Sequence, residues 1–294
     1  MKILGVLGVL YLVMSFPAYS HEGHGSSNQA SLMLVSTQDS RVEFLTNGNF
    51  RIIRSNAIPN HATGDFPNKG NPHTIKPQKL TYSVPFKPKK ASKITKSAGY
   101  QFGVAVNGVP FDPGTAEKRA GWSIEALTGD LNLGLDKSNA HVQPNGLYHY
   151  HGIPWAMLRT AEKNTNMLIG YAADGFPIFT NTSRGKGFRS SYRVKEGERN
   201  GGPGGKHDGT YTEDWEYVEG LGDLDECNGK EYEGRYVYFL TEQFPFVPRC
   251  FVGKPSTTFQ KRWSIMDWLS GQGRPREAPP PKKPSGPPPH KMPQ

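Results

Sequence analysis

Cysteine is scarce in this chain, and apolar residues are few. The 294 residues include only 2 cysteines, and the apolar types together reach 35%. Glycine and proline, which interrupt helices, are instead abundant, at 34 and 25 residues. This composition excludes a coiled coil, a helical bundle and a protein that crosses a membrane several times. It favours a mainly β protein, and we expect a single β-rich, loop-rich domain with one or two short helices.

Familiar catalytic signatures are missing as well. The chain contains no Gly-x-Ser-x-Gly motif, no phosphate-binding Gly-x-x-x-x-Gly-Lys motif and no His-Glu-x-x-His motif. These motifs mark many serine hydrolases, nucleotide-binding proteins and zinc proteases. Any chemistry of this chain must therefore come from another arrangement of side chains.

The first twenty residues have the features of a secretory signal peptide. A basic start at Lys2 precedes an apolar run from Ile3 to Met14, and the small residues Ala18 and Ser20 form a cleavage site. We expect cleavage after Ser20, which makes His21 the first mature residue. The run is short for a membrane span, which disfavours an uncleaved anchor. We therefore expect a secreted or periplasmic protein with no transmembrane span after cleavage.

Composition divides the remainder into three regions. Residues 21–40 are small and polar and predict a linker, and residues 41–274 are expected to form the domain. Residues 275–294 are basic and proline-rich, which predicts a disordered, extended tail. The formal net charge is +9. Because nucleic-acid-binding surfaces usually combine basic with aromatic residues, and the tail has no Phe, Tyr or Trp, we expect no nucleic-acid partner.

The two cysteines, Cys227 and Cys250, are expected to form a disulfide. An even number of cysteines in an exported chain favours this pairing. The bond would close a loop of about two dozen residues, which in the chain-entropy model stabilises the folded protein by about 3 kcal/mol. A pair of metal thiolates is the alternative, but the spacing does not match a Cys-x-x-Cys half-site.

Short segments rich in β-branched and aromatic residues predict strands. These segments are 41–46, 50–55, 80–86, 100–106, 168–172 and 235–240. Asn47-Gly48-Asn49, between the first two segments, is typical of a hairpin turn. Helical periodicity is confined to 155–162 and 263–269.

Histidines concentrate in residues 139–152. Side chains alternate along a strand, so His149 and His151 share one face. The place of His141 depends on the turn. A three-residue Pro144–Gly146 loop puts His141 opposite His149, whereas a two-residue turn puts it on the other face.

Three converging imidazoles would suit a Zn or Cu ion and leave one coordination position open. The alternative is that these histidines only form hydrogen bonds on a polar sheet surface. We predict a metal site formed by His141, His149 and His151.

Further ligands or supporting side chains could come from elsewhere in the chain. The candidates are His61, His207, Asp208 and Asp174. Oxygen-bearing residues from Asp223 to Asn228 resemble a calcium loop. However, Gly229 comes one residue late for an EF-hand, and no glutamate follows at the right distance. Calcium is therefore not favoured, and a polar turn beside Cys227 is expected.

The segment Tyr148-His149-Tyr150-His151-Gly152 resembles the signature of the YHYH-domain family of exported, mostly bacterial proteins. Several other blocks resemble that family too, and together they cover roughly residues 50 to 260. The blocks are 58–67, 107–113, 140–144, 170–178, 206–211 and 222–229. The resemblance implies an exported protein and assigns no reaction.

Three functions are consistent with these features. The first is transition-metal binding without turnover. The second is a metal-dependent extracellular enzyme, either a hydrolase or a copper oxidoreductase. The third is an envelope-associated module that binds a partner or a glycan without metal. A pocket with an open metal position and a nearby carboxylate would favour the enzyme, and histidines that point apart would favour the third function. The sequence identifies no particular small-molecule or glycan ligand.

Overall fold

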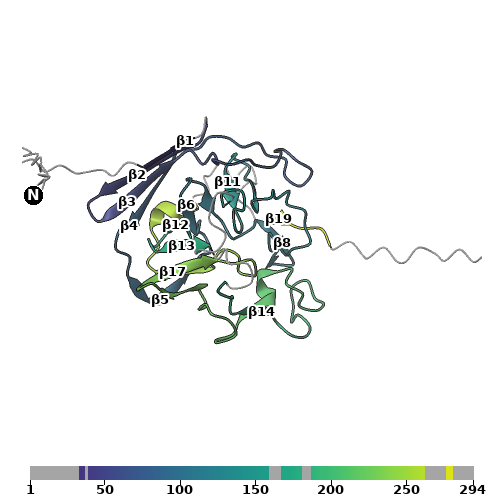
Figure 1. Ribbon diagram of the computed structural model, residues 1–294. Helices are drawn as coiled ribbons and strands as arrows, with labels where there is room; N and C mark the ends of the chain where they lie inside the picture. The colour runs from purple at the N-terminus through teal and green to yellow at the C-terminus, as the bar shows by residue number, and fades with distance from the viewer. Residues whose placement is uncertain (1–32, 37–38, 159–166, 181–186, 262–275, 281–294) are drawn as a thin grey trace, which may run out of the picture.

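The computed structural model describes residues 33–36, 39–158, 167–180, 187–261 and 276–280. Within this part of the chain the protein is built from short strands and long connections (Figure 1). Two 3₁₀ turns, Thr212–Asp214 and Thr257–Phe259, are the helical elements of the described residues. The expected β-rich class is confirmed.

The chain first forms a four-stranded antiparallel meander. Its strands are β1 (Met33–Ser36), β2 (Arg41–Asn47), β3 (Phe50–Ser55) and β4 (Leu80–Pro85), in that order. The turn between β2 and β3 contains Gly48, whose φ is +56°. Val42, Ile53 and Val84 are buried on the inner face, and in Figure 1 the sheet lies along one side of the molecule. Alternation of apolar and polar residues thus places one face against the core.

A mixed eight-stranded sheet forms the centre of the molecule. Its order is β10 (Ala140–Val142), β11 (Tyr148–Tyr150), β7 (Pro110–Phe111), β6 (Gly103–Ala105), β12 (Met167–Ala172), β13 (Pro177–Thr180), β17 (Arg235–Leu240) and β16 (Gly229–Tyr232). The pairs β11–β7 and β13–β17 are parallel, and the other pairs are antiparallel. The hairpin β10–β11 lies at one edge of this sheet.

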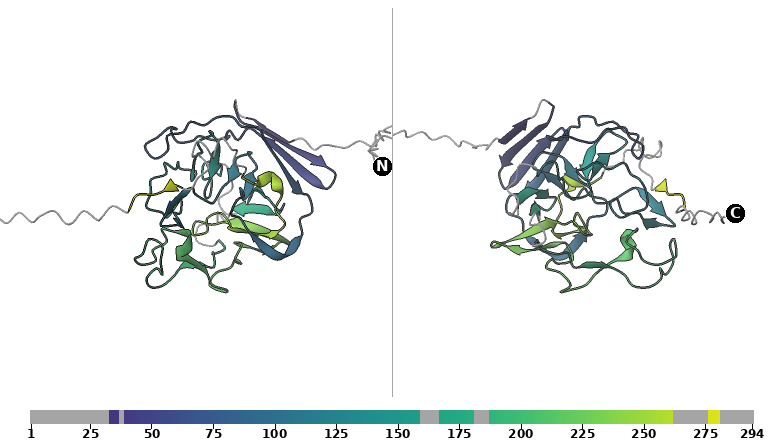
Figure 2. Two further views of the ribbon diagram at one scale, coloured as in Figure 1. Left: turned by 180° about the vertical axis from the view of Figure 1, so that it is seen from behind. Right: turned by 45° about the vertical axis from the view of Figure 1, so that its right-hand side comes forward.

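Smaller sheets surround the centre. They consist of β5 (Lys90–Lys96) with β18 (Cys250–Gly253), β14 (Tyr192–Val194) with β15 (Trp215–Tyr217), and β8 (Glu117–Arg119) between β9 (Trp122–Ser123) and β19 (Arg276–Glu277). The two views of Figure 2 show the meander packed along the central strands, with β14 at the far end of the molecule.

Aromatic side chains fill the core between these sheets. Phe102 stacks on Phe251 with ring centroids 5.1 Å apart and meets Tyr238 edge to face at the same distance. The disulfide between Cys227 and Cys250 lies in the same core, and both cysteines are buried. It joins the turn before β16 to β18, which confirms the expected pairing.

The structure differs from the sequence-based expectations in three local features. Residues 155–158, part of an expected helix, form a hydrogen-bonded turn, while 159–162 and 263–269 lie outside the described residues. Strand β1 lies within the expected linker, because its backbone pairs with β2. Strand β19 lies within the expected disordered tail, because its backbone pairs with β8.

No helix in the described part of the chain is both long and apolar enough to cross a membrane. The expected signal peptide, residues 1–20, lies outside the described residues.

Candidate metal centre

The hairpin that carries the histidines has the register predicted for a three-residue loop. His141 pairs with His149, and Val142 pairs with Tyr148. The loop closes through the Gly146 N–H, which donates to the carbonyl oxygen of Gln143 at 2.8 Å. Gly146 has a φ of +89°, a conformation that favours glycine. The turn therefore places His141 on the same face as His149 and His151.

The three histidines converge through their Nε2 atoms. Nε2 of His151 lies 3.0 Å from Nε2 of His141 and 3.0 Å from Nε2 of His149. Their candidate ligand atoms all lie within 4.8 Å of one another. A search of the described residues for three or more His, Cys, Asp or Glu side chains that could hold a metal ion finds these three histidines. The predicted convergence is confirmed.

Backbone carbonyls orient two of the rings. Nδ1 of His141 donates to the carbonyl oxygen of Leu133 at 2.9 Å, and Nδ1 of His149 donates to that of Leu147 at 3.2 Å. A neutral imidazole carries one proton, so these bonds leave the Nε2 lone pairs of both rings free to face the cluster. Nδ1 of His151 is buried and has no hydrogen-bond partner among the described residues.

Burial keeps the cluster neutral. His149 and His151 are each only 2% exposed. Desolvation, followed by the charge that His141 would carry, lowers the pKa of His149 well below 6.5. Desolvation and then the two other histidines lower the pKa of His151 well below 6.5. Desolvation likewise lowers the pKa of His141. All three rings are thus held in the form that binds metals.

The opposite face of the same hairpin is held by two tyrosines. The hydroxyl of Tyr148 donates to Oδ2 of Asp136 at 2.6 Å. The hydroxyl of Tyr150 accepts from Nδ2 of Asn107 at 2.9 Å and lies 2.6 Å from Nε2 of His61. His61 therefore supports the hairpin from the face opposite the cluster, where its ring contacts Tyr148 and Tyr150.

A pocket of about 150 Å³ opens beside the cluster. Its walls include His141 and His149 together with two acidic residues and one lysine, namely Asp112, Glu117 and Lys261. Asp112 is 1% exposed, and its Oδ1 lies 2.6 Å from Nζ of Lys261. The cluster is thus next to a small polar pocket that contains carboxylates.

The sequence analysis did not select these neighbours. Asp112 and Lys261 are separated by about half of the chain, and neither belongs to a recognisable ligand spacing. The only available signal was that Asp112 lies in one of the blocks that resemble the YHYH family.

His207 and Asp208 belong to a separate polar network. Nδ1 of His207 lies 2.9 Å from Oδ1 of Asp214, and the Arg199 guanidinium contacts both Asp214 and Asp208. Burial by itself would raise the pKa of Asp214. Hydrogen bonds from Arg199 and His207 outweigh this effect and hold the pKa well below its usual range. This network closes the loop before β15 and does not line the pocket beside the histidines.

Asp174 lies in the core next to β17 and β18. Its Oδ2 accepts hydrogen bonds from the Tyr238 hydroxyl at 2.6 Å and from the Gly253 N–H at 2.9 Å. Desolvation raises the pKa of Asp174 to about 6, although these hydrogen bonds act to lower it. The contacts of Asp174 make it part of the core rather than of the pocket beside the cluster.

The acidic turn around Cys227 uses its carboxylates internally. Oδ1 of Asp225 accepts from the backbone N–H groups of Cys227 and Gly229, and Oδ2 accepts from the Tyr236 hydroxyl. Oδ2 of Asp223 accepts from the Arg189 N–H at 2.7 Å. These bonds describe a polar turn, the arrangement expected beside the disulfide.

The fold and the cluster define a β-rich protein with a buried site of three histidines that is suited to a metal ion. The model of the YHYH protein family matches residues 81–253, well over half of the chain, and the chain belongs to this family. The block 58–67, which also resembles the family, lies before the matched range. Comparison with curated proteins and with solved structures found no match.

Proposed function

We propose that this protein is exported and binds one transition-metal ion, Zn or Cu, through Nε2 of His141, His149 and His151. Imidazole nitrogen is a preferred ligand of both metals. Export is supported by the signal-peptide pattern of residues 1–20 and by a disulfide between the two cysteines.

One observation carries the proposal. Since Nδ1 of His141 and of His149 each donate to a carbonyl, both rings direct an Nε2 lone pair toward Nε2 of His151 at 3.0 Å. His151 has at most one Nε2 proton when neutral and can make one well-aligned hydrogen bond with it. At least one of the 3.0 Å contacts is then left without a well-aligned hydrogen bond, while the Nε2 lone pairs of His141 and His149 both point at the same nitrogen, which is unfavourable without a cation between the rings. A metal ion relieves this repulsion.

The pocket supports a second candidate function, metal-dependent catalysis. Three protein ligands leave a coordination position open, and the pocket beside His141 and His149 includes the carboxylates of Asp112 and Glu117. A bound metal ion would supply Lewis acidity there. The hydrolase and the copper oxidoreductase remain the two forms of this proposal. The convergence of the histidines gives no support to the metal-free module.

The test is the metal content of the protein purified without added metal and without an affinity His-tag. We expect about one Zn or Cu ion per chain. His149→Ala should reduce the ratio well below one, because the two remaining imidazoles bind weakly, while the far-ultraviolet circular dichroism stays unchanged. His61→Ala, on the opposite face of the hairpin, is the matched control and should keep the metal. A wild-type protein that contains no metal and binds none on titration would overturn the proposal.

A further inference from the structure

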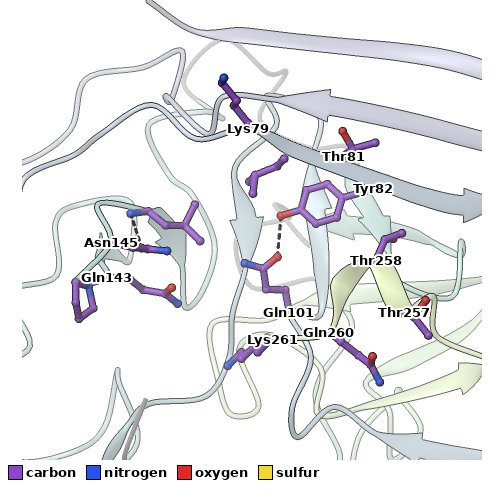
Figure 3. Close-up of a pocket in the computed structure, with 13 residues that line it drawn as sticks. Lys79, Thr81, Tyr82, Gln101, Gln143, Asn145, Thr257, Thr258, Gln260 and Lys261 are labelled. Carbon is purple, nitrogen blue, oxygen red and sulfur yellow. Dashed lines mark hydrogen bonds between the residues drawn. The ribbon is translucent and has the colours of Figure 1, made fainter. Parts of the chain in front are cut away.

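A second, larger pocket lies on the other side of the histidine hairpin loop. Its volume is about 440 Å³, which is within the size range of sites for small organic ligands. The two pockets share Gln143, Pro144 and Lys261 in their walls. The larger pocket, shown in Figure 3, is therefore adjacent to the pocket beside the candidate metal centre, and residues of the loop after β10 line both.

Two amide side chains face each other across this pocket. Figure 3 shows Gln101 and Asn145 approaching it from opposite walls. Oε1 of Gln101 accepts the Tyr82 hydroxyl at 2.7 Å, and Oδ1 of Asn145 accepts the Leu147 N–H at 3.1 Å. Because both amide oxygens are occupied by the protein, the NH₂ groups are the ends that remain for a ligand.

The remaining charges of the pocket are positive. Lys79 and Lys261 line it, and its lining within the described residues includes no Asp or Glu. Nζ of Lys261 also lies 2.6 Å from Oδ1 of Asp112, a carboxylate that lines the smaller pocket and not the larger one. A pocket with two amide donors and an ammonium group recognises hydrogen-bond acceptors that carry negative charge.

We propose that this pocket binds a small organic molecule with a carboxylate, which is held between the Gln101 and Asn145 amides beside Lys261. The planar carboxylate has four acceptor positions, enough for donors on two opposite walls. A ligand held there lies against the residues that also form a wall of the pocket beside His141 and His149. Any link between this ligand and the histidines rests on the proposed metal site, whereas binding of the carboxylate does not.

The experiment is calorimetric titration of the metal-free, disulfide-intact protein with matched pairs of ligands. The acids are succinate, citrate and glucuronate, and each is compared with its neutral amide. We expect at least one acid to bind at least about tenfold tighter than its amide, a difference equivalent to about 1.4 kcal/mol. Equal binding of acid and amide, or no acid that binds more tightly than about 10 mM, overturns the proposal.

Variants test whether the two amides are the donors. Asn145→Asp and Gln101→Glu keep the acceptor oxygens that Leu147 and Tyr82 use and replace each NH₂ by oxygen. Each should weaken binding of the acid by at least about tenfold. Gln260→Glu is the control, because it adds the same negative charge to the same pocket. The NH₂ group of Gln260 already donates to the Tyr100 hydroxyl and is not one of the proposed donors, so this variant should weaken binding of the acid less. An equal loss in Gln260→Glu would indicate general repulsion and contradict the assignment.

Tyr82→Phe provides a test without a change of charge. It removes the hydroxyl that orients Gln101 but keeps the ring that stacks on Phe259 at 4.2 Å. Binding of the acid should weaken several-fold while the fold is retained, and unchanged affinity would contradict a role for Gln101. Retention of carboxylate binding in His149→Ala, together with loss of metal, separates this proposal from the metal site.

Discussion

His141 and His149 lie directly opposite each other in the β10–β11 ladder, and each uses Nδ1 to bind a backbone carbonyl oxygen. The pairing brings the two rings to one face, with centroids 4.7 Å apart. The carbonyl bonds then determine which nitrogen of each ring faces the cluster. Position and tautomer are thus set by backbone groups, which makes the site sensitive to changes in the turn.

Changes in the loop are expected to reach the metal site. Gly146 has a φ of +89°, and a Cβ atom added there would lie 2.6 Å from Cβ of Lys76. Gly146→Ala should therefore lower the free energy of unfolding by about 1 kcal/mol or more and reduce metal affinity.

Gly48→Ala is the matched control for this change. Gly48 also has a positive φ, +56°, in a hairpin turn, but a Cβ atom there would meet nothing within 4 Å. Gly48→Ala should lower the free energy of unfolding without changing the metal content. Thermal unfolding and metal analysis of both variants check the prediction, and equal metal loss in both would contradict it.

The metal-free protein is expected to lose stability as the pH falls below about 6.5. The folded state lowers the pKa of His149 and His151, so it binds fewer protons than the unfolded chain, whose histidines titrate normally. Stability therefore rises with pH in this window, by up to about 1.4 kcal/mol per pH unit for each histidine. Urea unfolding between pH 7.5 and pH 5, roughly the range that brackets the ordinary histidine pKa, measures this slope.

Asp174 acts in the opposite direction and requires a control. Its pKa is raised to about 6, so protonation favours the folded state as the pH falls toward the ordinary carboxyl value. The difference between wild type and His149→Gln removes this common contribution. A smaller slope is expected in the variant, and identical slopes would show that His149 titrates normally in the fold.

Removal of the disulfide should destabilise the protein by about 3 kcal/mol, because the bond closes a loop in the unfolded chain. Cys227 and Cys250 are separated by 23 positions and are both buried. The Cys227→Ser, Cys250→Ser double variant tests this in chemical denaturation. Intact mass after alkylation without reductant checks the bond itself, and two alkylated thiols in the wild-type protein would refute it.

Two truncations test whether strand β19 stabilises the fold. Strand β19 pairs with β8, Nε of Arg119 donates to the Pro279 carbonyl at 2.9 Å, and Ala278 is buried. Deletion of 276–294 should therefore lower the free energy of unfolding by about 2–3 kcal/mol, from several lost hydrogen bonds of about 1 kcal/mol each. Deletion of 281–294 should leave it unchanged. Equal melting temperatures for the two truncations would contradict a stabilising role for β19.

Local features of the sequence were sufficient for the β class, the disulfide and the histidine cluster. Only one intramolecular pairing is possible for two cysteines. The two-residue period of a strand relates His149 to His151, and Pro144–Gly146 sets the register that adds His141. The histidine cluster depends on dihedral angles and spacings within a few residues, and the disulfide pairing depends only on the number of cysteines.

Only the tertiary structure decided what surrounds the cluster. Asp112 and Lys261 reach the neighbouring pocket from distant parts of the chain, and His61 lies on the opposite face of the hairpin. Strand β19 joins the fold through backbone pairing, which a proline-rich composition does not reveal. These neighbours depend on which strands pack together in a mixed sheet, and residue periodicity carries no information about that choice.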